Sequence, residues 1–79
     1  MTQVEERLKK VIVEKLGAEA SKVIPQANFK TDLLADDLDM TQVFIATEEE
    51  FEITFDEDQI EKIETMRDLI TLINKKSKK

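Results

Sequence analysis

The sequence predicts an all-α fold, a four-helix bundle with three longer helices and a short third helix. Apolar residues recur at spacings of three and four in separate segments, as they do along one face of a helix. One Gly and one Pro among 79 residues are too few for a turn-rich all-β fold. Capping residues stand where the periodic segments begin. We expect a single domain over residues 1–79, because chains of this length rarely divide.

The first helix is expected from about Gln3 to Leu16. Thr2 followed by Glu5 fits a capping box at its start. Gly17 follows the last apolar residue and suits a left-handed C-cap. The buried stripe of this helix should consist of Val4, Leu8, Val11, Ile12 and Leu16.

Residues 18–35 show no sustained period, and Pro25 is typical of a loop. Three apolar residues, Val23, Ile24 and Phe29, are expected to pin this loop across the core. A long ordered loop in so small a chain suggests a functional role.

The second helix should begin near Asp37 and end near Phe51, with acidic residues at its start, where the helix dipole favours negative charge. Its apolar residues form two faces rather than one. The first face holds Met40, Val43, Phe44, Thr47 and Phe51. The second face holds Leu38, Thr41 and Ile45. One face must pack inward, and the pattern leaves open whether the other is a partner-binding surface or is also buried.

The last third of the chain predicts a short helix and a longer one. Asp56 with Gln59 opens the short helix, which should run to about Ile63. Thr65 with Asp68 opens the final helix. Its buried stripe should consist of Met66, Leu69, Ile70 and Ile73, widened by Leu72. Residues 74–79 form a basic tail that we expect to fray.

Composition excludes several function classes. Without Cys there is no disulfide, thiol nucleophile or zinc–thiolate site, and without His the commonest general base is missing. We therefore predict that the protein is not an enzyme. Residues 32–64 carry thirteen acidic residues and one basic residue. This acidic block disfavours nucleic acid and favours a basic protein surface as the partner.

The N-terminal region is polar, and no apolar run is long enough to span a bilayer. We expect a monomer without membrane insertion. Its expected location is the cytoplasm, or an organelle lumen after removal of a targeting segment. The acidic clusters at 36–39 and 56–58 lack the spacing of an EF-hand, so we predict no metal site.

The run Asp-Leu-Leu-Ala-Asp-Asp-Leu-Asp at residues 32–39 resembles the Asp-Leu-Gly-Ala-Asp-Ser-Leu-Asp of the acyl carrier protein family. The resemblance covers nearly the whole chain and implies a role in fatty-acid, polyketide or related acyl metabolism. Its further support is Glu48-Glu49-Glu50-Phe51, then Ile53, Phe55-Asp56-Glu57-Asp58, Glu61-Lys62-Ile63, Thr65 and Asp68.

Two departures fall inside this motif. The family's Ser receives 4′-phosphopantetheine from coenzyme A, and the sequence has Asp37 in its place; Leu34 replaces the family's Gly. A carboxylate attacking the same phosphorus would form a hydrolysable mixed anhydride, so we predict that Asp37 is not modified and that no cofactor is held. Since Ser and Asp are near-equal N-caps, Asp37 is expected to keep the capping role. The only serines, Ser21 and Ser77, stand in other contexts.

The resemblance also implies a docking surface on the second helix, through which the protein would bind basic surfaces of synthases, transferases or acyltransferases. Its residues would be Asp36, Leu38, Asp39, Thr41, Ile45, Glu48 and Glu49. Two alternatives stay open. The chain is a working acyl carrier, with Asp37 an engineered replacement or another residue modified, or it is a structural adaptor that carries nothing.

Overall fold

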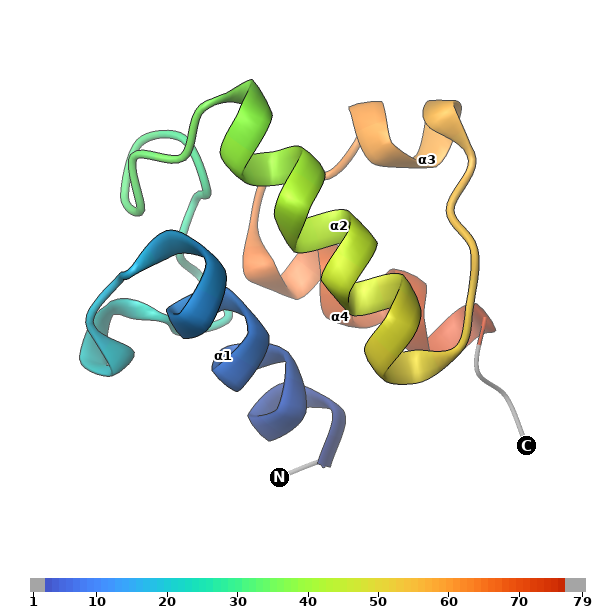
Figure 1. The fold of residues 1–79 in the computed structure, drawn as a ribbon, viewed down its shortest axis with the longest axis horizontal. Coiled ribbons are helices and arrows are strands. Elements are labelled where there is room, and N and C mark those ends of the chain that lie inside the picture. The colour runs from blue at the N-terminus through green and yellow to red at the C-terminus, as the bar shows by residue number, and fades with distance from the viewer. Residues whose placement is uncertain (1–2, 77–79) are drawn as a thin grey trace.

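The structure is a computed structural model and describes residues 3–76 (Figure 1). Its elements in chain order are α1 (Gln3–Leu16), the 3-10 helix η1 (Ala20–Lys22), α2 (Asp37–Phe51), α3 (Glu57–Glu61) and α4 (Met66–Lys76). The predicted all-α bundle with a short third helix is confirmed, while η1 was not predicted. Within residues 3–76 there is no strand, only an isolated antiparallel bridge between Asn28 and Thr65.

The core lies where α1 packs against α2 and α4. Figure 1 shows α2 crossing the middle of the molecule, with α1 on one side and the short α3 near the start of α2 on the other. The fully buried side chains come from all three longer helices and include Leu8, Ile12, Val43, Met66, Leu69 and Ile73. Burial of these apolar stripes supplies the main stabilising free energy, about 1.5–3 kcal/mol for each fully buried side chain.

Most of the predicted helix ends are confirmed. Gly17 has φ 67°, and its N–H donates to the Val13 carbonyl at 2.9 Å, as a left-handed C-cap does. The predicted Thr2–Glu5 capping box cannot be placed, because Thr2 lies outside the described residues.

Two helix ends differ from the prediction. α3 ends at Glu61, two residues before Ile63, because the N–H of Ile63 donates to the Ile60 carbonyl at 3.1 Å and tightens the last turn. α4 continues to Lys76, so residues 74–76 of the predicted frayed tail are helical. The buried Ile73 anchors this last turn, and Lys75 and Lys76 complement the helix dipole. Residues 77–79 lie outside the described part.

The start of α4 has the predicted capping box. The Asp68 carboxylate accepts hydrogen bonds from the N–H groups of Glu64 at 3.0 Å and Thr65 at 3.1 Å, and the Thr65 hydroxyl accepts from the Asp68 N–H at 3.2 Å. The backbone N–H groups of Glu64 and then Thr65 lower the pKa of Asp68, because they stabilise the ionised carboxylate.

The long loop is held across the bundle by its backbone. The Phe29 N–H donates to the Glu64 carbonyl, and the Met66 N–H donates to the Ala27 carbonyl. Val23 and Phe29 are buried, as predicted, but Ile24 is 45% exposed and the prediction for it was wrong. The Ala27 N–H donates to the Ile24 carbonyl in a turn that brings Ala27, not Ile24, into the core.

Candidate functional site

The start of α2 is closed by two carboxylates that belong to one capping box. Asp36 is the N-cap: its carboxylate accepts from the Asp39 N–H at 2.8 Å, and the Asp39 carboxylate accepts from the Asp36 N–H at 3.3 Å. The prediction that Asp37 caps the helix was therefore wrong. Asp36 already satisfies the free N–H of Asp39, so Asp37 occupies the first helical position instead.

Asp37 is exposed, and its carboxylate accepts none of the hydrogen bonds found among residues 3–76. Its backbone carbonyl accepts a hydrogen bond from the Thr41 hydroxyl at 3.0 Å. The N-terminus of the helix favours the negative charge of Asp37 through the helix dipole. The Asp37 carboxylate thus contributes a charge–dipole interaction to the fold but no hydrogen bond among the described residues.

The second apolar face of α2 is exposed, so the alternative that α2 is buried on two sides is excluded. Leu38 is 67% exposed and Ile45 is 51% exposed, with Thr41 between them also exposed. The opposite face is buried and holds Met40, Val43, Phe44 and Thr47. α1 packs against α2, and the exposed face is left to solvent among the described residues.

The two glutamates at the far end of this exposed face differ in environment. The Glu48 carboxylate is half-buried and accepts a hydrogen bond from the Phe55 N–H at 2.8 Å, which ties α2 to the segment before α3. Glu49 is exposed. Glu48 therefore has a structural role that the sequence did not indicate, whereas Glu49 offers its charge to solvent.

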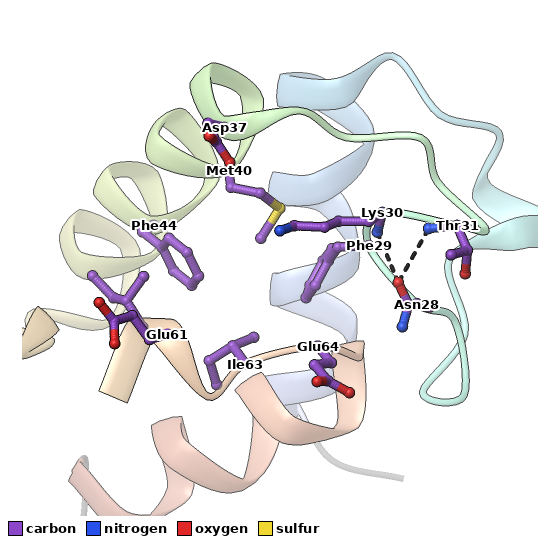
Figure 2. Close-up of a pocket in the computed structure, with 11 residues that line it drawn as sticks. Asn28, Phe29, Lys30, Thr31, Asp37, Met40, Phe44, Glu61, Ile63 and Glu64 are labelled. Carbon is purple, nitrogen blue, oxygen red and sulfur yellow. Dashed lines mark hydrogen bonds between the residues drawn. The ribbon is translucent and has the colours of Figure 1, made fainter. Parts of the chain in front are cut away.

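A cavity of about 520 Å³ lies between the start of α2, the loop at residues 28–31 and α3 (Figure 2). Its apolar wall includes Phe29, Met40, Phe44, Ile60 and Ile63, and Asp37 lies at its edge. The Lys30 side chain extends across the cavity toward Met40. The aromatic ring of Phe44 lines this space and meets Phe55 edge to face, with ring centroids 5.8 Å apart.

Sequence analysis missed two residues of this wall, Asn28 and Lys30. The Asn28 carboxamide oxygen accepts from the N–H groups of Lys30 at 2.9 Å and Thr31 at 3.1 Å, while the Asn28 N–H donates to the Asp32 carboxylate at 2.8 Å. An Asn that bonds the backbone two residues on is the signal of a turn, and it could have located this one.

Leu34, the second departure from the family motif, has a left-handed backbone. Its φ is 56°, and its side chain is 78% exposed. This conformation costs a residue with a side chain about 1–2 kcal/mol, and Gly adopts it freely. Of the described non-glycine residues, only Glu52 at the C-cap of α2 shares it, with φ 57°.

The site thus combines exposed carboxylates at the start of the central helix α2 with a cavity that has an apolar wall. A family model described as a phosphopantetheine attachment site matches residues 6–73. The acyl carrier protein of Nitratidesulfovibrio vulgaris strain DP4 is 44% identical over 73 residues, covering 92% of this chain and 96% of that protein. That of Zymomonas mobilis subsp. mobilis is 43% identical over 74 residues, covering 94% and 95%. The chain belongs to the acyl carrier protein family.

Membership confirms the family resemblance and the prediction that the protein is not an enzyme, since acyl carrier proteins are carriers. The helices described over residues 3–76 are too short or too polar to cross a membrane. In the same residues, no three acidic side chains gather as a metal ion would require.

Proposed function

We propose that this chain is an acyl carrier homologue of fatty-acid or polyketide-type metabolism that docks on basic partner enzymes but is not loaded with 4′-phosphopantetheine. The observation that carries this proposal is Asp37, a carboxylate at the place where the family motif has its Ser. The family's cofactor is not disputed; the proposal concerns this chain's ability to hold it.

The residues at the start of α2 do not fit covalent attachment. The family's Ser supplies a neutral hydroxyl that ends in a stable phosphodiester, whereas the Asp37 carboxylate would be repelled by the pyrophosphate of coenzyme A. The hydroxyl nearest in sequence belongs to Thr41, and it donates to the Asp37 carbonyl. Ser21 lies in η1, away from α2 in the chain. The Asp37 charge instead imitates the phosphodiester of a loaded carrier, so partners would meet a similar surface.

Docking is supported by the composition of the exposed face of α2. We define the docking surface as Asp36, Leu38, Asp39, Thr41, Ile45, Glu48 and Glu49. Leu38 and Ile45 provide apolar contact, and the surrounding carboxylates steer the protein toward Arg and Lys side chains. The docking surface belongs to a segment, residues 32–64, that carries thirteen acidic residues and one basic residue.

Loading is tested by incubation with coenzyme A and a broad-specificity phosphopantetheinyl transferase, followed by intact-mass measurement. The proposal predicts no mass gain for the native chain. The matched control is Asp37→Ser, which restores the family motif and should gain one arm. A native chain that gains the arm would contradict the proposal, and peptide mapping would then identify the modified residue.

A structural adaptor is the second candidate, because the exposed apolar side chains of α2 are present without the Ser to which the family attaches the cargo arm. The two candidates differ in their partners. An adaptor remains bound to a complex through Leu38 and Ile45 when the native chain is used as bait, whereas a pathway homologue binds individual acyl-metabolism enzymes transiently. Loss of retention in Leu38→Glu and Ile45→Glu tests the surface in both cases.

A further inference from the structure

Leu34 is an unusual residue for its position. Of the large apolar side chains described by the structure, it is the most exposed, at 78%. Its backbone has φ 56°, a conformation that disfavours every residue except Gly and, to a lesser degree, Asn and Asp. A Leu here is unfavourable twice, once for its backbone and once for its contact with water.

The exposed side chain of Leu34 does not contribute to the packing of the core. The neighbours of Leu34 on either side make the packing contacts: Leu33 packs against the core and Ala35 is buried. Hydrogen bonds from the Leu33 N–H to the Asn28 carbonyl and from the Ala35 N–H to the Phe29 carbonyl fix the backbone around it. Neither bond depends on the side chain at position 34, so stability does not explain the Leu.

We propose that Leu34 is an apolar anchor that extends the docking surface into the loop before α2. This inference rests on the proposed function. Leu34 precedes Leu38 by four residues, and Leu38 is itself 67% exposed. In the chain, the exposed residues Asp36 and Asp37 stand between Leu34 and Leu38, and the exposed Asp32 precedes Leu34 by two residues.

The acidic residues near Leu34 in the chain indicate which kind of partner surface would cover its side chain. An exposed apolar side chain with three exposed Asp residues within three positions of it in the chain complements a protein surface with an apolar pocket bordered by Arg or Lys. The fixed backbone of the loop holds the side chain outward before the partner arrives, which lowers the entropy lost on binding. The occupant is thus a basic partner enzyme of acyl metabolism, and Leu34 tunes affinity for it.

The test uses the full chain and two probes, a phosphopantetheinyl transferase without coenzyme A and a ketoacyl synthase, with affinities measured by surface plasmon resonance. Leu34→Gly should weaken binding about tenfold to at least one probe while raising the melting temperature by roughly 4–8 °C. Leu34→Met keeps an apolar side chain of similar size and should bind within about twofold of the native chain.

Glu52→Gly is the matched control for the backbone. It relieves the same left-handed conformation at the far end of α2 and should raise the melting temperature with little change in affinity. Native-like binding by Leu34→Gly to both probes would overturn the inference and leave the proposed function standing. A native chain that binds neither probe would contradict the proposed docking itself.

Discussion

The two faces of α2 are built from adjacent residues and differ in burial. Phe44 is buried against Phe55, while Ile45, the next residue, is 51% exposed. The buried face is occupied by contacts with the rest of the chain, and the exposed face keeps apolar side chains in water beside carboxylates. A helix whose sequence is apolar on two sides therefore separates into one face for folding and one available for binding.

The largest expected change in stability comes from truncating a buried side chain of α2, and the same truncation on the exposed face serves as its comparison. Phe44→Ala should lower the free energy of unfolding by about 3–5 kcal/mol, because it removes a buried ring and leaves a cavity. Ile45→Ala should change it by less than about 0.5 kcal/mol. Urea unfolding followed by circular dichroism measures both; Phe44→Leu provides a milder variant if Phe44→Ala does not fold. Equal losses at the two positions would remove the distinction between the faces.

Replacing an apolar side chain of the exposed face with an acidic one should weaken partner binding and leave the free energy of unfolding almost unchanged. Leu38→Glu is expected to weaken retention of a basic acyl-metabolism enzyme by about 30-fold, because it replaces an apolar contact with a carboxylate that the partner's apolar pocket does not accommodate. Pull-down and calorimetry measure this, with Glu14→Gln, an exposed position on α1 outside the docking surface, as a control that should bind like the native chain. Unchanged binding by Leu38→Glu would exclude this face as the interface.

A second comparison is between two acidic residues at helix starts. Asp68 belongs to the capping box of α4, whereas Asp37 stands beside the Asp36–Asp39 box of α2 without being part of it. Asp68→Asn should cost about 1 kcal/mol at neutral pH, whereas Asp37→Asn should cost less than about 0.5 kcal/mol, because the Asp37 carboxylate accepts no hydrogen bond among the described residues. Thermal melts at pH 7 compare the two. A larger loss at Asp37 would show that the fold depends on its charge.

The pH dependence of Asp68 follows from its lowered pKa. The folded chain ionises this carboxylate more readily than the unfolded chain, so its contribution is fully present above the unfolded pKa of about 3.8. The contribution is lost as the pH falls through the lower folded pKa. The difference in melting temperature between the native chain and Asp68→Asn should therefore shrink below about pH 4. A constant difference down to pH 2 would contradict this.

The smallest effect concerns the backbone at the end of α2. Glu52→Gly should raise the free energy of unfolding by about 0.5–1 kcal/mol, because Gly adopts the left-handed C-cap without strain. Chemical denaturation at neutral pH measures the gain. A loss of stability would show that the Glu52 side chain stabilises the fold in a way that its exposure does not suggest.

Much of this structure could be predicted from the sequence because local signals agreed with packing. The bounds of the three longer helices were predicted to within a few residues from Gly17, the Thr65–Asp68 capping box and the apolar stripes. The capping of α2 was placed one residue late, since Asp36 and Asp37 are chemically identical and only the geometry of Asp39 separates them. The exposure of Ile24 and the cavity wall at Asn28 and Lys30 depend on local turns in the loop, which hydrophobic periodicity does not reveal.

The central claim is that the chain has the carrier fold and docking surface but cannot accept the prosthetic arm at position 37. A single reaction mixture containing the native chain and Asp37→Ser, with coenzyme A and one transferase, tests this directly by intact-mass spectrometry. The account predicts that only Asp37→Ser shifts by the mass of one arm. A shift of both proteins would contradict it.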